Sequence, residues 1–183
     1  MKASRKNLLA LAAVFILPVV LAYFALQGDW FNRGVTNKGT LVEPPLDLSV
    51  LDQPDDPKWR LLYVLPESCD KACNNALYAI HQVWLALGRE QDRVEPLVLV
   101  PESEMAKARQ AIKELGHIRL QAANRKDVNK VFKAQSANGI FIVDTLGQVI
   151  LRYPLKQQKQ QAVLSSRDIL SDMKKLLKLS RIG

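Results

Sequence analysis

The chain has 183 residues, enough for one domain of ordinary size plus an appendage. Its two cysteines argue against a scaffold of several disulfides and against a tetrahedral zinc site of four cysteine or histidine ligands. The net charge of +8 gathers after residue 104, without an arginine-rich run or interleaved aromatic residues. We therefore expect no nucleic-acid partner, but a solvated basic face that would steer toward acidic lipid or an acidic partner.

An apolar stretch without charged residues runs from residue 8 to residue 26. As a helix rising about 1.5 Å per residue, it just spans a hydrocarbon core of about 30 Å. Lys2, Arg5 and Lys6 precede it, and basic residues favour the cytoplasmic side. We expect residues 1–7 in the cytoplasm, residues 8–26 as a single transmembrane anchor in a bacterial inner membrane, and the following soluble part in the periplasm.

A cleavable signal peptide is the alternative interpretation of the same stretch. The apolar region of a signal peptide usually has about 7–15 residues and ends in small residues at alternate positions. Ala22 and Ala25 come nearest to that pattern, but the bulky Tyr23 and Phe24 lie between them. No cysteine stands near the end of the stretch, which excludes a lipid-modified amino terminus. We therefore favour a retained anchor.

Residues 27–58 are rich in proline, glycine, asparagine and aspartate and lack a sustained apolar period. This composition predicts a periplasmic tether between the anchor and a domain at residues 59–183. A short extended segment of the tether could still lie against that domain, through Leu41, Val42, Leu46 and Leu48.

The remaining sequence predicts buried strands that alternate with amphipathic helices. Short apolar runs predict strands at residues 59–65, 96–100, 117–120, 140–143 and 149–153, the last two as a hairpin. Apolar residues three and four apart predict helices at residues 68–87, 101–115, 124–134 and 166–179. Such alternation requires parallel crossovers, and the hairpin adds an antiparallel edge. The order is that of an α/β, thioredoxin-like domain: a central mixed sheet with helices on both faces.

Cys69 and Cys73 lie where the first strand of this domain passes into the first helix. A spacing of four places both sulfur atoms on one helical face, so that they can meet one ligand or each other. Their Cα atoms would be about 6 Å apart, within disulfide range, and an oxidising periplasm favours that bond. A helix amino terminus favours a thiolate at Cys69, which Asp70 opposes and Lys71 in turn offsets.

On these residues the chain resembles the Sco/SenC family, thioredoxin-fold proteins that help to assemble the copper centre of cytochrome c oxidase. The resemblance covers about residues 38–155: the opening Gly39-Thr40-Leu41, the cysteine pair, and the closing Ile140-Phe141-Ile142-Val143-Asp144 with Gly147. Ordinary thioredoxins space their cysteines three apart and place a cis-proline where this chain has Asn138-Gly139.

The resemblance implies a thiol–disulfide oxidoreductase or copper site formed by Cys69 and Cys73. Cys69 would attack or bind Cu(I), and Cys73 would resolve. Copper is then the expected cofactor, and a respiratory oxidase subunit or assembly factor the expected partner beside the membrane. The family's third copper ligand, a histidine, falls at Gln135 in this chain, and the prolines that follow the family's cysteines are Asp70 and Asn74 here. Two thiolates alone suit Cu(I) but not a stable Cu(II) site.

Neither histidine of the chain replaces the missing ligand. His81 would lie about 12 Å along the helix from Cys73, and His117 would begin a strand at the opposite end of the sheet. We expect an ordinary surface or satisfied histidine at both positions.

Two functional hypotheses remain open. The first is a factor for respiratory oxidase maturation that acts through thiol–disulfide exchange or a Cu(I) site at the cysteine pair. The alternative is a non-catalytic accessory protein of respiratory complex assembly whose pair is a structural disulfide. An ordinary cytosolic enzyme is disfavoured, because nothing else in the sequence forms a catalytic constellation.

Overall fold

The computed structural model describes residues 2–28, 36–53, 56–132 and 137–181. These residues form two units, one that ends at Thr36 and one that begins at Asn37. The first unit is helix α1 (Lys2–Gln27), whose segment Arg5–Ala25 has a mean hydropathy of 2.7. Its length and composition fit one membrane span, as the sequence predicted. The cytoplasmic placement of residues 1–7 stays a prediction.

The second unit contains a six-stranded sheet in the order β1-β6-β5-β2-β3-β4. Strands β2, β3 and β4 are parallel, whereas β5 is antiparallel to β2 and to β6, and β6 is antiparallel to β1. The strands are β1 (Thr40–Asp47), β2 (Trp59–Val64), β3 (Val94–Val100), β4 (Arg119–Ala122), β5 (Ile140–Val143) and β6 (Gln148–Tyr153). The predicted mixed sheet is thereby confirmed.

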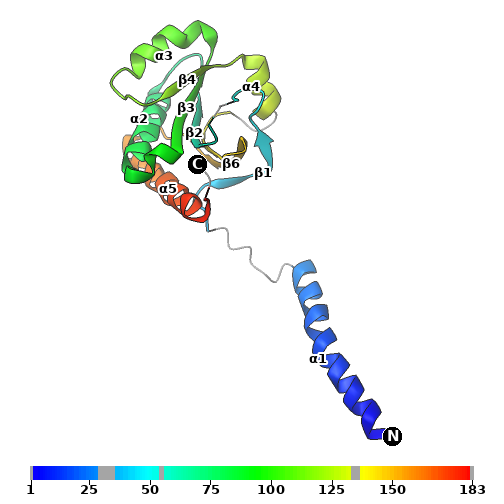
Figure 1. Cartoon of the computed structure of the whole chain (residues 1–183). Helices are drawn as coiled ribbons and strands as arrows, with labels where there is room; N and C mark the ends of the chain where they lie inside the picture. The colour runs from blue at the N-terminus through cyan, green and yellow to red at the C-terminus, as the bar shows by residue number, and fades with distance from the viewer. Residues whose placement is uncertain (1, 29–35, 54–55, 133–136, 182–183) are drawn as a thin grey trace. The chain divides into compact units, whose positions relative to one another are not determined.

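Helices cover both faces of this sheet, as Figure 1 shows with α2 and α5 on one side and α4 on the other. They are α2 (Lys71–Ala86), α3 (Met105–Ala111), α4 (Arg125–Phe132) and α5 (Lys159–Leu179), with short 3-10 helices η1 (Gly88–Arg93) and η2 (Glu102–Glu104). Along β2, Leu61 and Tyr63 point into the core beneath α2 and α5, and Leu62 into the core beneath α4. Burial on both faces explains why the central strands are continuous apolar runs.

Strand β1 confirms that part of the expected tether lies as an extended segment against the domain, and it makes this segment a strand of the sheet. Residues 40–47 pair with β6 at the edge of the sheet, and Val42 is buried. The sequence hides this strand because Pro44 and Pro45 interrupt its alternation, and the register shifts between Leu41 and Leu46. Proline cannot donate a ladder hydrogen bond, so an edge strand accommodates it where a central strand would not.

Helix α5 begins at Lys159, seven residues before the predicted start. Ser166 was expected to open the helix, but its hydroxyl donates a 2.8 Å hydrogen bond to the Ala162 carbonyl within the helix. Only Ala162 is buried in the first turns, so these turns lack the apolar period that marks the rest of α5.

Two buried carboxylates connect the segments around β1 to the rest of the domain. Asp52 contacts Arg60 at 3.0 Å and Arg119 at 2.8 Å, which joins the loop after β1 to β2 and β4. Asp172 of α5 accepts hydrogen bonds from the backbone amides of Lys38 (2.6 Å) and Gly39 (2.9 Å). The chain therefore joins the domain at α5.

Candidate functional site

The predicted pair, Cys69 and Cys73, forms a disulfide with the Cα atoms 5.2 Å apart. Cys69 precedes α2, and Cys73 lies in its first turn. Cys69 is exposed, whereas Cys73 has no exposed surface. The bond therefore presents one sulfur atom to an incoming group and keeps the other inside the core.

Asp70 is the N-cap of α2, one turn later than the predicted start of the helix. Its carboxylate accepts a 2.9 Å hydrogen bond from the Cys73 amide and a 2.7 Å bond from the Gln157 side chain. The bond from Cys73 and then the bond from Gln157 lower the pKa of Asp70. A negative charge therefore stands beside the cysteine pair, where the helix amino terminus by itself would favour a thiolate.

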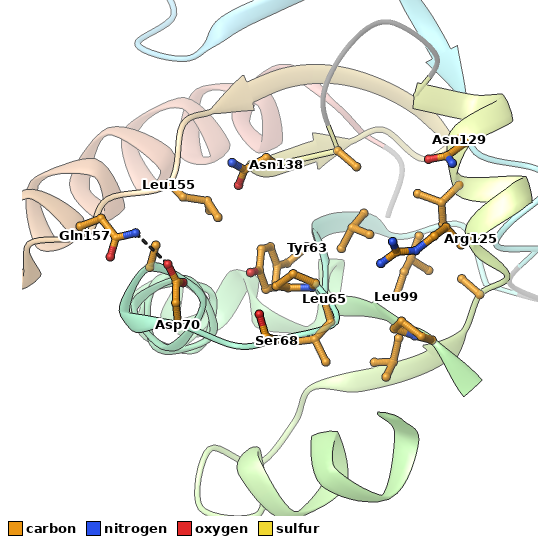
Figure 2. Close-up of a pocket in the computed structure, with 18 residues that line it drawn as sticks. Tyr63, Leu65, Ser68, Asp70, Leu99, Arg125, Asn129, Asn138, Leu155 and Gln157 are labelled. Atoms are coloured by element: carbon orange, nitrogen blue, oxygen red, sulfur yellow. Dashed lines mark hydrogen bonds between the residues drawn. The ribbon is translucent and has the colours of Figure 1, made fainter. Parts of the chain in front are cut away.

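A first hollow of about 520 Å³ lies beside Asp70 at the ends of β2 and β3. Figure 2 shows Arg125 of α4 extending its guanidinium group toward the hollow, across from Tyr63. Arg125 also contacts Glu67 at 3.0 Å. Apolar residues form much of the remaining wall: Val64, Leu65, Leu99, Val128 and Leu155.

Tyr63 is one of the polar groups of this hollow that the sequence did not indicate. Its side chain is fully buried, and its hydroxyl has no hydrogen-bond partner among the residues that the structure describes. Burial, and then the charge of Asp70, raise the pKa of Tyr63. The hydroxyl therefore keeps its proton, as a buried donor beside the wall of the hollow.

A second hollow, of about 320 Å³, lies on the side of α3 and is the one that Cys69 lines. Leu77, Ala108, Ile112 and Leu120 form apolar parts of its wall, and charged residues also border it: Glu67, Glu104 and Lys107. The sequence places Ala108 and Ile112 on the inner face of a helix, but the wall that they share with Cys69 depends on how α3 packs.

The two histidines gather away from the disulfide, near the later turns of α2. The ring of His117 stacks on Trp84 at 4.7 Å, and β4 begins only at Arg119. His81 is half-buried, and its Nδ1 atom has no hydrogen-bond partner in the described part of the chain. Burial, and then the charge of His117, lower the pKa of His81. His81 is therefore partly exposed, away from the disulfide, with one buried ring nitrogen that no described residue pairs.

No group of three or more potential metal ligands of the His, Cys, Asp or Glu type occurs within residues 2–28, 36–53, 56–132 and 137–181. Gln135, the position of the expected third copper ligand, lies outside the described residues. The reduced cysteine pair would thus offer two thiolates, a donor set that suits Cu(I).

Comparison with solved structures identifies the fold. Apo Sco1 from Thermus thermophilus is 18% identical, with a TM-score of 0.55 over 79% of this chain and 99% of that chain. ScoI from Bradyrhizobium japonicum with copper bound is 17% identical, with a TM-score of 0.47 over 70% of this chain and 97% of that chain. The thioredoxin domain of a thiol-disulfide oxidoreductase from Bacteroides vulgatus is 14% identical, with a TM-score of 0.43 over 60% and 79%. The match to Sco1 from Thermus thermophilus confirms the predicted thioredoxin-like fold.

No curated protein matches the sequence. The family model described as transmembrane-like, thioredoxin-like, C-terminal domain matches residues 59–180, from the start of β2 to one residue past the end of α5. Through this domain, which follows an apolar amino-terminal helix, the chain belongs to the transmembrane-like, thioredoxin-like family.

Proposed function

We propose that the chain is a membrane-anchored, Sco-like thiol–disulfide protein that assists cytochrome c oxidase assembly on the periplasmic side of a bacterial inner membrane. The observation that carries the proposal is the disulfide between exposed Cys69 and buried Cys73, with a hollow on either side of the loop that holds it. The Sco-like fold, the apolar helix α1 and the family assignment support the proposal.

The exposed sulfur atom determines the order of the exchange. A thiolate of a partner dithiol attacks Sγ of Cys69, the bond between Cys69 and Cys73 breaks, and Cys73 leaves as a thiolate that takes up a proton. The partner's second thiolate then attacks the partner sulfur atom of the mixed disulfide. This step forms the partner's disulfide and releases Cys69 as a thiolate that takes up a proton. Two electrons and two protons pass from the partner dithiol to this chain, and the reverse sequence oxidises a partner.

Copper, in this proposal, is a cargo that the reduced pair holds as Cu(I). The reduced full chain should compete with a chelator for Cu(I) and show no sulfur-to-Cu(II) charge-transfer band, because two thiolates do not stabilise Cu(II). Gln135→His should create Cu(II) binding if residue 135 occupies the ligand position of the family. Tight Cu(II) binding by the unchanged protein would contradict this ligand set.

Glutathione provides a direct test of the exchange. The Cys73→Ala variant of the full chain should form a mixed disulfide between Cys69 and glutathione, detected by its mass, because Cys69 is exposed. The matched Cys69→Ala variant should react far more slowly, because Cys73 is buried. Equal reaction of the two variants would overturn the assignment of Cys69 as the attacked sulfur.

The alternative function is a non-catalytic accessory protein of respiratory complex assembly, and the complete burial of Cys73 favours a structural role for the disulfide. Oxidase activity in cells separates the two functions. A Cys69→Ser/Cys73→Ser chain that still reaches the membrane should fail to support oxidase activity under the first function. It should support normal activity under the second.

A further inference from the structure

Helix α5 presents a basic face to solvent. Its buried residues Ala162, Ile169, Asp172, Met173 and Leu177 define the inner side of the helix. Arg167, Lys174 and Lys178 follow one another at intervals of seven and four residues, which places them in one stripe opposite that side. All three side chains are exposed and form no ion pair with any residue that the structure describes. We call this stripe the basic face of α5.

Charge and apolar surface on α5 are both unusual for a solvated helix. Besides Asp172, which is buried, the helix has one acidic residue, Asp168, against five exposed basic residues. Leu164 and Leu179 remain 58% and 83% exposed next to the basic residues. Basic residues beside exposed leucines are the composition of helices that lie on lipid headgroups.

The chain reaches the domain at this same helix. Lys38 and Gly39 donate their backbone amides to Asp172, and Gly28 ends the hydrogen bonding of α1. The ten Cα steps from Gly28 to Lys38 span at most roughly 35 Å, whereas a domain of this size is roughly 38 Å across. If α1 spans a membrane, the point where the chain joins α5 therefore lies at most about 35 Å from the end of the span.

We propose that the basic face of α5 binds a bilayer surface that carries anionic headgroups. The inference rests on the proposed membrane anchor, which brings α5 within reach of that surface. Arg167, Lys174 and Lys178 attract the headgroups, and Leu164 inserts between them. No residue of α5 lines either hollow beside the disulfide, so Cys69 stays accessible while α5 is bound.

The test uses the full chain in nanodiscs of neutral lipid, with or without phosphatidylglycerol, that contain a nitroxide on a fraction of the headgroups. Gln160→Cys, exposed on α5, carries a fluorophore, while the native cysteines stay in their disulfide. Quenching should rise in anionic discs and fall again in molar salt, where the Debye length is about 3 Å. A label at Lys126→Cys, on α4, should show no such rise.

Charge removal makes the test specific to α5. Each of the substitutions Arg167→Gln, Lys174→Gln and Lys178→Gln should weaken the docking equilibrium roughly fivefold, and the triple variant that combines them should lose most of the quenching gained in anionic discs. The control triple variant Arg109→Gln/Lys113→Gln/Lys126→Gln removes the same charge from exposed positions elsewhere and should quench like the parent. Equal quenching in neutral and anionic discs, or equal loss in both triple variants, would overturn the proposal. A chain that fails to enter the discs at all would instead contradict the anchor.

Discussion

The hydroxyl of Tyr153 donates a 2.8 Å hydrogen bond to the carboxylate of Asp172, and both side chains are buried. Burial, followed by this bond, raises the pKa of Tyr153. The ring of Tyr153 also packs against Gly39, where an added Cβ would lie 2.5 Å from its Cζ atom. Tyr153 and Asp172 therefore hold the segment that leads into β1.

We expect Tyr153→Phe to lower the free energy of unfolding by about 1.5–3 kcal/mol, the usual contribution of a hydrogen bond to a charged group. Gly39→Ala should also destabilise the domain, because its methyl group would displace the Tyr153 ring. Urea unfolding of the full chain in detergent, followed by tryptophan fluorescence, measures both. Asp168→Asn, exposed and one turn earlier on α5, should change the value by less than about 0.5 kcal/mol. A similar effect of Asp168→Asn would contradict a special role for Asp172.

The ion pair between Asp52 and Arg60 should be costly to break, because each side chain is only 2% exposed. Burial lowers the pKa of Arg60, and the charge of Asp52 opposes that shift. Asp52→Ala leaves a buried guanidinium group without its partner and should cost about 3–5 kcal/mol of unfolding free energy. The double variant Asp52→Leu/Arg60→Met should recover part of this loss in the same urea titration. A double variant less stable than Asp52→Ala would contradict the explanation.

Removing the charge of Asp70 should activate the cysteine pair. In Asp70→Asn the side-chain oxygen can still accept from the Cys73 amide, since asparagine is as good an N-cap as aspartate. The negative charge beside Cys69 is lost, so the thiolate fraction of reduced Cys69 should rise. Alkylation of the reduced chain by iodoacetamide at neutral pH should accelerate severalfold. Glu67→Gln, a nearby exposed acid that caps no helix, serves as the control, and equal acceleration there would refute the assignment.

His81 should make stability depend on pH. Burial and then the charge of His117 depress its folded pKa below the ordinary value of 6.5, so the unfolded chain binds the proton more readily. The stability that the folded chain has with a neutral His81 is fully present above pH 6.5. It is lost as pH falls from 6.5 through the folded pKa of His81. Thermal unfolding midpoints should fall across this window. His81→Gln should reduce the fall, and an unchanged profile would show that His81 is not its source.

The sequence predicts the centre of this fold better than its edges. Strands β2 and β5 are buried on both faces of the sheet. Each therefore appears in the sequence as a continuous apolar run that differs clearly from the turns around it. Strand β1 and the first turns of α5 lie at the surface, where burial leaves no regular period. In β1, Pro44 and Pro45 also interrupt the pattern, so the sequence predicts a tether there instead of a strand.

The site shows the same division. The spacing of Cys69 and Cys73 predicts their proximity, because one helical turn brings them together. The sequence around Tyr63, by contrast, does not predict its unpaired hydroxyl, since a tyrosine within an apolar run is expected to be an ordinary core residue. The stacking of His117 on Trp84 likewise depends on how α2 packs against the loop before β4.

The two prolines of β1 also limit how copies of this protein can meet. At one edge of the sheet they remove two amide hydrogens from the strand, and at the other edge β4 has only four residues. A neighbouring copy therefore finds little backbone with which to extend the sheet. Such edges disfavour edge-to-edge pairing of two copies and the fibrous aggregation that such pairing would start.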